Sequence, residues 1–350
     1  MHKVAVVGAG IGAEHLRGYT ALPDHFKVTT LCDLDQSRAQ PLADEFGTAL
    51  VSDFDTVLAD SDTDIVDICL PPHLHFMTCM QALEAGKHVV CEKPLVSSLA
   101  EADALIAKSH ETGKMVFPVF QYRFGLGTAQ MRALMQAGLA GKCYAGTLET
   151  HWDRPASYYD IDWRGTWAGE QGGAILGHAI HIHDLLPSVL GPIAKVYADV
   201  ATRVNDIEVE DCAAITLRME DGALITSSVT LGTAGNISRM RLMFEGFTVE
   251  SDHAPYAPAA AGWTFTAREP TKQADIDTVL ANVDSVPIGY PGMFLAMAEA
   301  LAGHPGREVN LQDGRRSLEF VTAVYASARS NLPVDLPIGP DHPMYDGWLP

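Results

Sequence analysis

The stretch VAVVGAGIGAEH, residues 4–15, joins an apolar run to a glycine-rich turn. Residues 8–13 fit the pattern G-x-G-x-x-G/A, which between a strand and a helix is typical of dinucleotide binding. Gly8 allows a tight turn, Gly10 lets the backbone approach a pyrophosphate, and Ala13 permits close helix–strand packing. The start of the helix adds backbone N–H donors and the positive end of the helix dipole. The expected phosphate contacts are Gly8, Gly10, Ile11, Gly12 and Ala13.

A carboxylate follows the turn at the distance that the pattern requires. Asp33 ends the next apolar run, 20 residues after Ala13. An acidic side chain there binds the ribose hydroxyls of NAD and repels the 2′-phosphate of NADP. Arg38 comes five residues later and would soften this preference, although an arginine on a surface helix is equally ordinary. The sequence therefore predicts NAD as the cofactor, with NADP as the alternative.

The order of the apolar runs divides the chain into two parts. Up to about residue 120, short β-branched runs such as KVTTLCD and IVDICL alternate with helical stretches such as 97–112. This alternation indicates βαβ units and a parallel sheet. Beyond residue 123, strand candidates follow one another closely, with short turns such as Glu220-Asp221-Gly222, and helices are expected near 292–302 and 312–329. The close strands favour an antiparallel sheet.

We therefore predict an α/β protein with two domains. Residues 1–122 form an N-terminal Rossmann domain with a parallel sheet that binds NAD(P). Residues 123–350 form a C-terminal α/β domain that has a large, mostly antiparallel open sheet and serves in substrate binding and oligomerisation.

Composition excludes several classes of partner. Lys and Arg total 24 against 44 Asp and Glu, so the formal net charge is −20. This charge disfavours nucleic acid and anionic membranes. No apolar run approaches the length of a membrane span. The six cysteines include no CxxC pair, so neither a zinc knuckle nor a disulfide framework is indicated. A strand that begins at Lys3 leaves no room for a signal peptide, and we expect a cytoplasmic protein.

Further motifs lie in a fixed order along the chain. They are Pro71-Pro72-x-x-His75, Ala82-Leu83-x-x-Gly86-Lys87-His88-Val89, Glu92-Lys93-Pro94, Trp163-Arg164, Gly172-Gly173 and His181-x-x-Asp184. Together with the glycine-rich turn they resemble the Gfo/Idh/MocA oxidoreductases, the family of glucose–fructose oxidoreductase and inositol dehydrogenase. The C-terminal part of the chain adds little beyond Tyr290. The resemblance implies NAD(P)-dependent hydride transfer at a hydroxyl or carbonyl carbon of a sugar, sugar derivative or cyclitol.

The resemblance also implies roles for individual residues. Lys93 would lie beside the nicotinamide, where an ammonium group stabilises a developing alkoxide and, with a pKa lowered by desolvation, joins a proton relay. His181 is the matching base, because imidazole accepts a proton near neutral pH. The further cofactor contacts implied are Leu70, Pro71, His75, Glu92, Lys93, Gln121, Trp163 and Arg164. The substrate contacts implied are Lys93, Arg123, Tyr158, Arg164, His178, His181 and Asp184; the stretch HWDRPASYYDIDWRGTW, 151–167, suits a polyhydroxylated ring.

One position departs from the commonest family pattern. Many relatives have Asp four residues before the histidine, whereas this chain has Gly177. His178 could bind substrate in its place, and Asp184 could orient the imidazole or serve a structural purpose. No metal site is expected, because His183 leaves the helical face shared by residues 177, 181 and 184, and no cysteine lies nearby.

Two other functions fit the same motifs. Some relatives cleave a glycosidic bond through transient oxidation by NAD, and others could sense a sugar or NAD without catalysis. The presence of both Lys93 and His181 argues against a sensor, which needs no proton acceptor. Relatives often associate through the C-terminal sheet, so we expect a homodimer or homotetramer.

Overall fold

The N-terminal third of the chain forms a six-stranded sheet of parallel strands, with the order β3-β2-β1-β4-β5-β6. The computed structural model describes all residues, 1–350. The strands are β1 (His2–Val7), β2 (Phe26–Cys32), β3 (Ala49–Val51), β4 (Ile65–Ile68), β5 (His88–Cys91) and β6 (Val116–Pro118). The predicted parallel sheet is confirmed. The sequence analysis did not identify β3, which is a three-residue edge strand with no buried residue.

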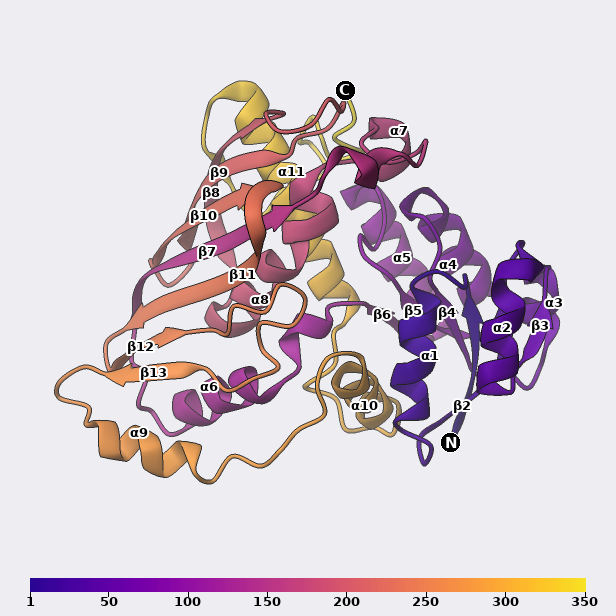
Figure 1. Cartoon of the computed structure of the whole chain (residues 1–350), viewed down its shortest axis with the longest axis horizontal. Coiled ribbons are helices and arrows are strands. Elements are labelled where there is room, and N and C mark those ends of the chain that lie inside the picture. The colour runs from indigo at the N-terminus through magenta and orange to yellow at the C-terminus, as the bar shows by residue number, and fades with distance from the viewer. The chain divides into compact units, whose positions relative to one another are not determined.

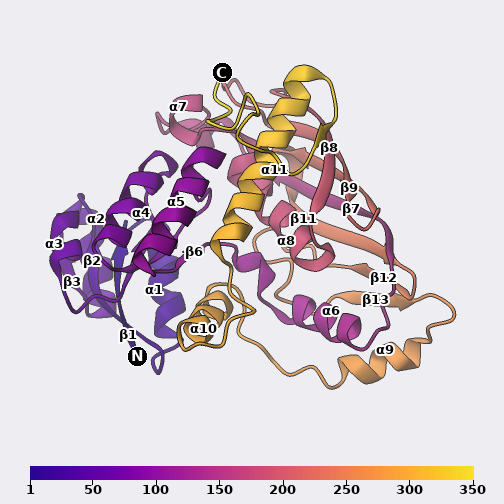
Figure 2. The same cartoon turned by 180° about the vertical axis from the view of Figure 1, so that it is seen from behind.

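Helices join successive strands of this sheet and cover both of its faces (Figures 1 and 2). They are α1 (Gly12–Thr20), α2 (Gln36–Phe46), α3 (Phe54–Ala59), α4 (His75–Glu84) and α5 (Leu99–Thr112), with a 3₁₀ turn η1 (Pro72–Leu74) before α4. Because helices pack on both sides, β4 and β5 are apolar almost throughout. In sheets of this topology, a dinucleotide binds at the edge formed by the carboxyl ends of the strands.

A segment far along the chain belongs to the same unit. The first compact unit comprises residues 1–119 and 290–318, and the second comprises 120–289 and 319–350. The predicted ranges 1–122 and 123–350 assigned 290–318 to the other domain. Helix α10 (Tyr290–Leu301) packs on α1, where Phe294 stacks on Tyr19 with ring centroids 3.9 Å apart. Gly18 makes this contact possible, since a Cβ there would lie 2.8 Å from the Phe294 ring.

The second unit contains an eight-stranded sheet of order β13-β12-β11-β7-β10-β9-β8-β14. Its strands are β7 (Cys143–Asp153), β8 (Ile193–Ala201), β9 (Cys212–Met219), β10 (Leu224–Thr230), β11 (Gly232–Phe244), β12 (Phe247–Glu250), β13 (Thr264–Ala267) and β14 (Val334–Asp335). Only β7 and β10 pair in parallel, so the predicted antiparallel character is confirmed. The predicted turn at Asp221-Gly222 joins β9 to β10, with Gly222 at φ +95°.

The second unit also contains helices, of which α8 (Ile180–Leu190) packs on one face of this sheet against β7 and β11 (Figures 1 and 2). They are α6 (Leu126–Gln136), α7 (Trp167–Glu170), α8, α9 (Gln273–Leu280) and α11 (Leu311–Ser330), whose residues from Glu319 belong to this unit. Short turns η2 (Gln121–Arg123), η3 (Ala156–Tyr159) and the π-helical η4 (Ile175–Ala179) complete the unit. Residues of β9 and β10 alternate between buried and exposed, so the opposite face of the sheet is exposed in this chain. None of the helices combines the length and apolarity needed to cross a membrane.

Candidate functional site

The glycine-rich turn after β1 packs directly against the end of β4. Gly8 has φ +106°, and a Cβ there would lie 2.4 Å from the carbonyl oxygen of Cys69. A Cβ at Gly10 would instead meet no atom within 4 Å. Helix α1 starts with Ile11 as its N-cap and no side-chain capping bond. The turn is therefore tight on its protein side and open at Gly10, as the backbone must be to approach a pyrophosphate.

Asp33 lies at the end of β2 and is joined to the turn by a hydrogen bond. Its Oδ2 accepts from the N–H of Ala9 at 2.7 Å, and its Oδ1 accepts from the N–H of Asp35 at 2.8 Å. Arg38 donates to both oxygens through Nη2, at 3.0 and 2.8 Å. Burial opposes ionisation, but these donors lower the pKa of Asp33 below its usual value. A buried, ionised carboxylate therefore lies at the end of β2, at the position for which the sequence predicts a ribose contact.

Lys93 follows β5 at the same edge of the parallel sheet, where Leu70 and Pro71 follow β4. Its backbone N–H donates to Glu92 Oε2 at 3.0 Å, and the Lys93–Pro94 bond is cis. The two strand ends are joined by His75, whose ring nitrogens lie 2.7 Å from the Pro94 oxygen and 2.8 Å from the Leu70 oxygen. Burial lowers the pKa of His75.

The structure shows His75 in contact with the backbone of the protein itself, and its predicted contact with the cofactor stays a prediction. Both ring nitrogens of His75 lie within hydrogen-bond distance of a backbone carbonyl, and the neutral ring donates to one of the two, so the residue lies between two loops that the resemblance assigns to the cofactor. Sequence reasoning identified the residue but not this arrangement, because the carbonyl partners belong to segments that are brought together only by the sheet.

In the second unit, a widened helical turn leads into the helix that carries the predicted base. The π-helical turn η4 contains His178, and α8 follows with His181 and Asp184. The His181 ring stacks on Tyr122 with centroids 4.6 Å apart, and the Tyr122 hydroxyl donates to the Pro255 oxygen at 2.6 Å. The stacking on Tyr122 therefore fixes the orientation of the His181 ring. π-Helical turns are rare and occur frequently at functional sites.

Arg123 and Asp184, two predicted substrate contacts, form an ion pair with each other. Arg123 donates through Nε to Oδ2 at 2.7 Å and through Nη2 to Oδ1 at 2.5 Å. The Asp184 side chain is buried, so this two-point contact compensates a charge that would otherwise be costly. Asp184 therefore has a structural role, one of the two roles that the sequence left open for it. The ion pair links η2 to α8.

His183 points to the sheet rather than along the face of His181. Its Nε2 lies 2.8 Å from the Ser227 hydroxyl of β10, and its ring lies against Phe320. Burial lowers the pKa of His183 to about 3, so the ring is neutral at physiological pH. The divergence of His183 from its neighbours agrees with the predicted helical spacing.

A cluster of aromatic and cationic side chains surrounds His178. Arg154 donates through Nε to His178 Nε2 at 3.2 Å, and its guanidinium lies 4.8 Å from the Trp152 ring and 5.1 Å from the Tyr158 ring. Its Nη2 donates to the Tyr256 hydroxyl at 3.2 Å. Because Nε2 of His178 accepts, the neutral ring carries its proton on Nδ1. This set of five is called the Arg154 cluster below.

Sequence reasoning missed three members of the Arg154 cluster. Trp152 and Arg154 lie in the mixed aromatic and charged stretch 151–167, which was the available signal for them. Tyr256 comes from the loop after β12 and carries no local signal. The predicted residues of the same stretch also meet: the Arg164 guanidinium lies 3.9 Å from the Tyr158 ring and 5.3 Å from the Trp163 ring. Gln121 opens η2.

A buried carboxylate clamps the chain where η4 begins. Glu210 accepts from the N–H groups of Gly173 and Ile175, both at 3.0 Å, and from the Tyr325 hydroxyl at 3.1 and 3.0 Å. Gly173 must be glycine, because a Cβ would lie 1.8 Å from the Glu210 carbonyl oxygen. Burial raises the pKa of Glu210 to about 7 against these hydrogen bonds. The sequence analysis did not select Glu210, since its partners lie far away in the chain.

Two family models cover most of the chain. The model described as "Oxidoreductase family, NAD-binding Rossmann fold" matches residues 2–120, and that of the GFO/IDH/MocA C-terminal domain matches residues 128–250. The chain therefore belongs to the GFO/IDH/MocA family of oxidoreductases and is an NAD-binding oxidoreductase. The resemblance read from the motifs is confirmed, as is the NAD cofactor.

Individual relatives extend over nearly the same length. The chain is 26% identical to the D-glucoside 3-dehydrogenase of Escherichia coli, over 95% of this chain and 97% of the relative. It is 28% identical to inositol 2-dehydrogenase 2 of Paenarthrobacter aurescens, over 75% and 81%. Among solved structures, the WlbA dehydrogenase of Bordetella pertussis in complex with NADH and UDP-GlcNAcA has a TM-score of 0.84 at 28% identity, over 96% and 99%.

We predict that Asp33→Ala raises the ratio of kcat/KM with NADP to kcat/KM with NAD by about tenfold or more, because the repelling carboxylate is lost and Arg38 is freed for a phosphate. Steady-state kinetics with both cofactors measure the ratio. Asp44→Ala, which removes an exposed carboxylate from α2, the helix that carries Arg38, is the matched control. A ratio equal to that of the wild type would remove Asp33 from the ribose site.

We predict that Glu210 makes stability depend on pH between about 4.5 and 7. The folded protein keeps a proton on Glu210 that the unfolded chain releases, so the stabilisation is present at low pH and is lost as pH rises through this window. The unfolding free energy of the wild type, relative to Glu210→Gln, should fall by up to about 3 kcal/mol across it. Urea unfolding at pH 5 and pH 8 measures this difference.

The matched control for Glu210 is Glu208→Gln, which changes an exposed carboxylate two residues away. The difference in unfolding free energy between Glu208→Gln and the wild type should stay constant over the same pH range. An equally constant difference for Glu210→Gln would contradict the assignment of a raised pKa to this carboxyl.

Proposed function

We propose that the protein transfers a hydride between NAD and a hydroxyl or carbonyl carbon of a sugar, a sugar derivative or a cyclitol. The names of its relatives support this substrate class, since they include a glucoside dehydrogenase and an inositol dehydrogenase. The observation that carries the proposal is the Arg154 cluster around His178.

The Arg154 cluster has the chemistry that a polyhydroxylated ring requires. Aromatic faces such as that of Tyr256, which is exposed, pack against the C–H faces of a sugar, and Arg154, His178 and Tyr256 offer hydrogen bonds to hydroxyls. The cluster also orders these groups, because Arg154 stacks on Trp152 and Tyr158 while binding His178. It adjoins the helix of His181 within one unit.

The first unit supplies residues that fit the cofactor. We propose that the turn at Gly8, Gly10 and Gly12 binds the pyrophosphate and that Asp33 binds the adenosine ribose, in agreement with the open space at Gly10 and the ionised state of Asp33. NAD, when bound, supplies the hydride acceptor. The other contacts implied by the family resemblance remain part of this proposal.

Lys93 and His181 are proposed as the catalytic residues. As the hydride leaves the carbinol carbon, His181 takes the hydroxyl proton, and the Lys93 ammonium stabilises the negative charge that develops on oxygen. The stacking of His181 on Tyr122 orients the ring that receives the proton. A crystal structure with NADH and substrate bound would measure whether both side chains reach the same oxygen.

Gly177 stands where many relatives carry Asp, and we propose that the neighbouring His178 takes over the missing contact. A Cβ at Gly177 would meet no atom within 4 Å, so the position leaves room for a substrate group. The hydrogen bond from Arg154 keeps Nε2 of His178 an acceptor and directs its proton to Nδ1.

We further propose that the protein works in the cytoplasm as a homodimer or homotetramer. All six cysteines are free, which suits a reducing compartment. The exposed face of the eight-stranded sheet carries Tyr144, Tyr197 and Leu224, and is the proposed interface. Light scattering of the purified protein measures the assembly, and cell fractionation measures the location.

A panel of polyols, aldoses and glycosides, incubated with NAD or NADP, tests the function. Steady NADH formation, followed by its absorbance, supports the dehydrogenase. Release of a sugar without NADH would instead indicate a glycosidase that uses transient oxidation. Binding of sugar and NAD without turnover would indicate a sensor.

We predict that Lys93→Ala and His181→Ala each lower kcat by about 100-fold or more, the scale expected for a lost charge-stabilising or proton-transfer group. Lys27→Ala and His253→Ala, which remove exposed side chains of the same types, are the matched controls. NAD binding, measured by fluorescence, checks that the variants are folded. Turnover close to that of the wild type in either variant would remove that residue from the chemistry.

A further inference from the structure

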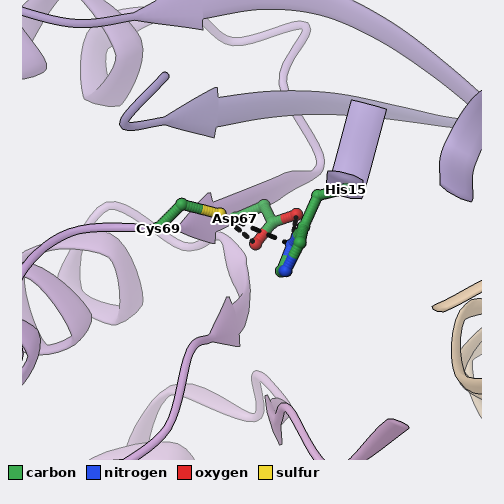
Figure 3. A group of neighbouring side chains, drawn as sticks. All are labelled: His15, Asp67 and Cys69. Carbon is green, nitrogen blue, oxygen red and sulfur yellow. Dashed lines mark hydrogen bonds and ion pairs between the residues drawn. The ribbon is translucent and has the colours of Figure 1, made fainter. Parts of the chain in front are cut away.

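The first unit buries a cluster of ionisable side chains that the proposed chemistry does not use. His15 of α1 and Asp67 of β4 are fully buried, and Cys69 and Glu92 are nearly so. His15, Asp67 and Cys69 point toward one another (Figure 3), with their ligand-type atoms within 4.8 Å. Buried charges are costly unless they are paired, so the cluster needs a physical explanation.

His15 lies between two carboxylates. Its Nδ1 is 2.8 Å from Asp67 Oδ2, and its Nε2 is 3.1 Å from Glu92 Oε1. A neutral imidazole has one donor and one acceptor, so one of its nitrogens would face a carboxylate lone pair with a lone pair of its own. With both carboxyl groups ionised, the arrangement therefore requires an imidazolium ion. Burial opposes that charge, but the charge of Asp67 and its hydrogen bond hold the pKa of His15 well above the usual range.

The same three side chains could be mistaken for a metal site. The Cys69 Sγ lies 3.4 Å from His15 Nδ1 and 3.6 Å from Asp67 Oδ1. Metal binding requires the thiolate and a neutral imidazole. Burial raises the pKa of the Cys69 thiol far above neutral pH, and His15 carries its proton between carboxylates. The hydrogen-bonded network is thus the better account of the cluster.

Glu92 connects this network to Lys93. Its Oε1 faces His15 and also accepts from the Tyr290 hydroxyl at 3.3 Å, and its Oε2 accepts from the backbone N–H of Lys93 at 3.0 Å. The Tyr290 ring lies on the His15 ring with centroids 4.6 Å apart. Three elements, α1, the end of β5 and α10, therefore meet at one carboxylate adjacent in sequence to Lys93, and β4 joins them through the bond of Asp67 to His15.

We propose that His15 is a positioning residue for Lys93: its imidazolium ion holds the Glu92 carboxylate, and that carboxylate fixes the backbone from which the Lys93 side chain extends. Asp67 keeps the imidazole charged, and Tyr290 closes the other side of Glu92. The inference rests on the proposed catalytic role of Lys93.

The protonation state is tested on the unaltered full-length enzyme. Nuclear magnetic resonance of protein labelled with ¹⁵N-histidine should show both ring nitrogens of His15 protonated at pH 8, with the signal assigned by its loss in His15→Gln. A neutral tautomer at that pH would overturn the proposal. A stoichiometric metal in the purified enzyme that is lost in His15→Gln would overturn it as well.

The coupling to Lys93 is tested by double-mutant cycles. Tyr290→Phe keeps the ring packing and removes the hydroxyl from Glu92, so it remains informative if His15→Gln does not fold. We expect each variant to lower kcat by about tenfold or more, as a displaced catalytic group does, with NAD affinity changed less than about twofold. In the Lys93→Ala background the same changes should cause no further loss. The matched control is His25→Gln, a change at a partly exposed histidine of the same unit.

The outcomes of the cycles separate the two proposals. If Lys93→Ala leaves turnover intact, the proposed catalytic role of Lys93 fails. If Lys93→Ala lowers turnover as predicted but His15→Gln and Tyr290→Phe lower the remaining rate further by the same factors as in the wild type, only the positioning role of His15 is overturned. If His15→Gln and Tyr290→Phe no longer lower kcat in the Lys93→Ala background, the positioning role is supported.

Discussion

The approach of the Gly8 backbone to the Cys69 carbonyl is the constraint on which the first unit depends. Only a residue without a Cβ allows β1 to turn there at positive φ while its turn lies against the end of β4. The same turn presents the Ala9 N–H to Asp33. The Cys69 side chain in turn contacts His15, so Cys69 packs against both the glycine turn and the buried ionic cluster.

Buried ionisable groups with fixed partners recur in both units and serve the same purpose. In the first unit, His15 is held between Asp67 and Glu92. In the second, Glu210 binds backbone N–H groups at the start of η4, and Arg123 binds Asp184 on α8. Such groups are poor sources of net stability but define geometry closely, because each unpaired alternative is costly. They lie next to the segments that carry Lys93 and His181.

Some of the site was accessible from local patterns and some was not. The glycine turn and Asp33 follow a regular spacing, so their residue types indicate a dinucleotide contact, and the contiguous Glu92-Lys93-Pro94 motif was identified through the family resemblance. The Arg154 cluster draws Tyr256 from a loop 102 residues away from Arg154, and Tyr290 meets Glu92 across 198 residues. No periodicity encodes such pairs, because they arise only when separate strands and helices pack. The three-residue strand β3 was missed because it carries no buried, alternating pattern.

The sequence by itself determined the fold class, the family and the NAD cofactor, since these depend on short-range features: apolar periodicity, turn glycines and motifs on neighbouring strand ends. The tertiary structure alone decided that 290–318 joins the first unit, that His75 lies between two loops, that Asp184 pairs with Arg123, and that His15 is enclosed by carboxylates. The physical reason is that the partner of a buried polar group is chosen by three-dimensional proximity and desolvation, and neither can be read from spacing along the chain.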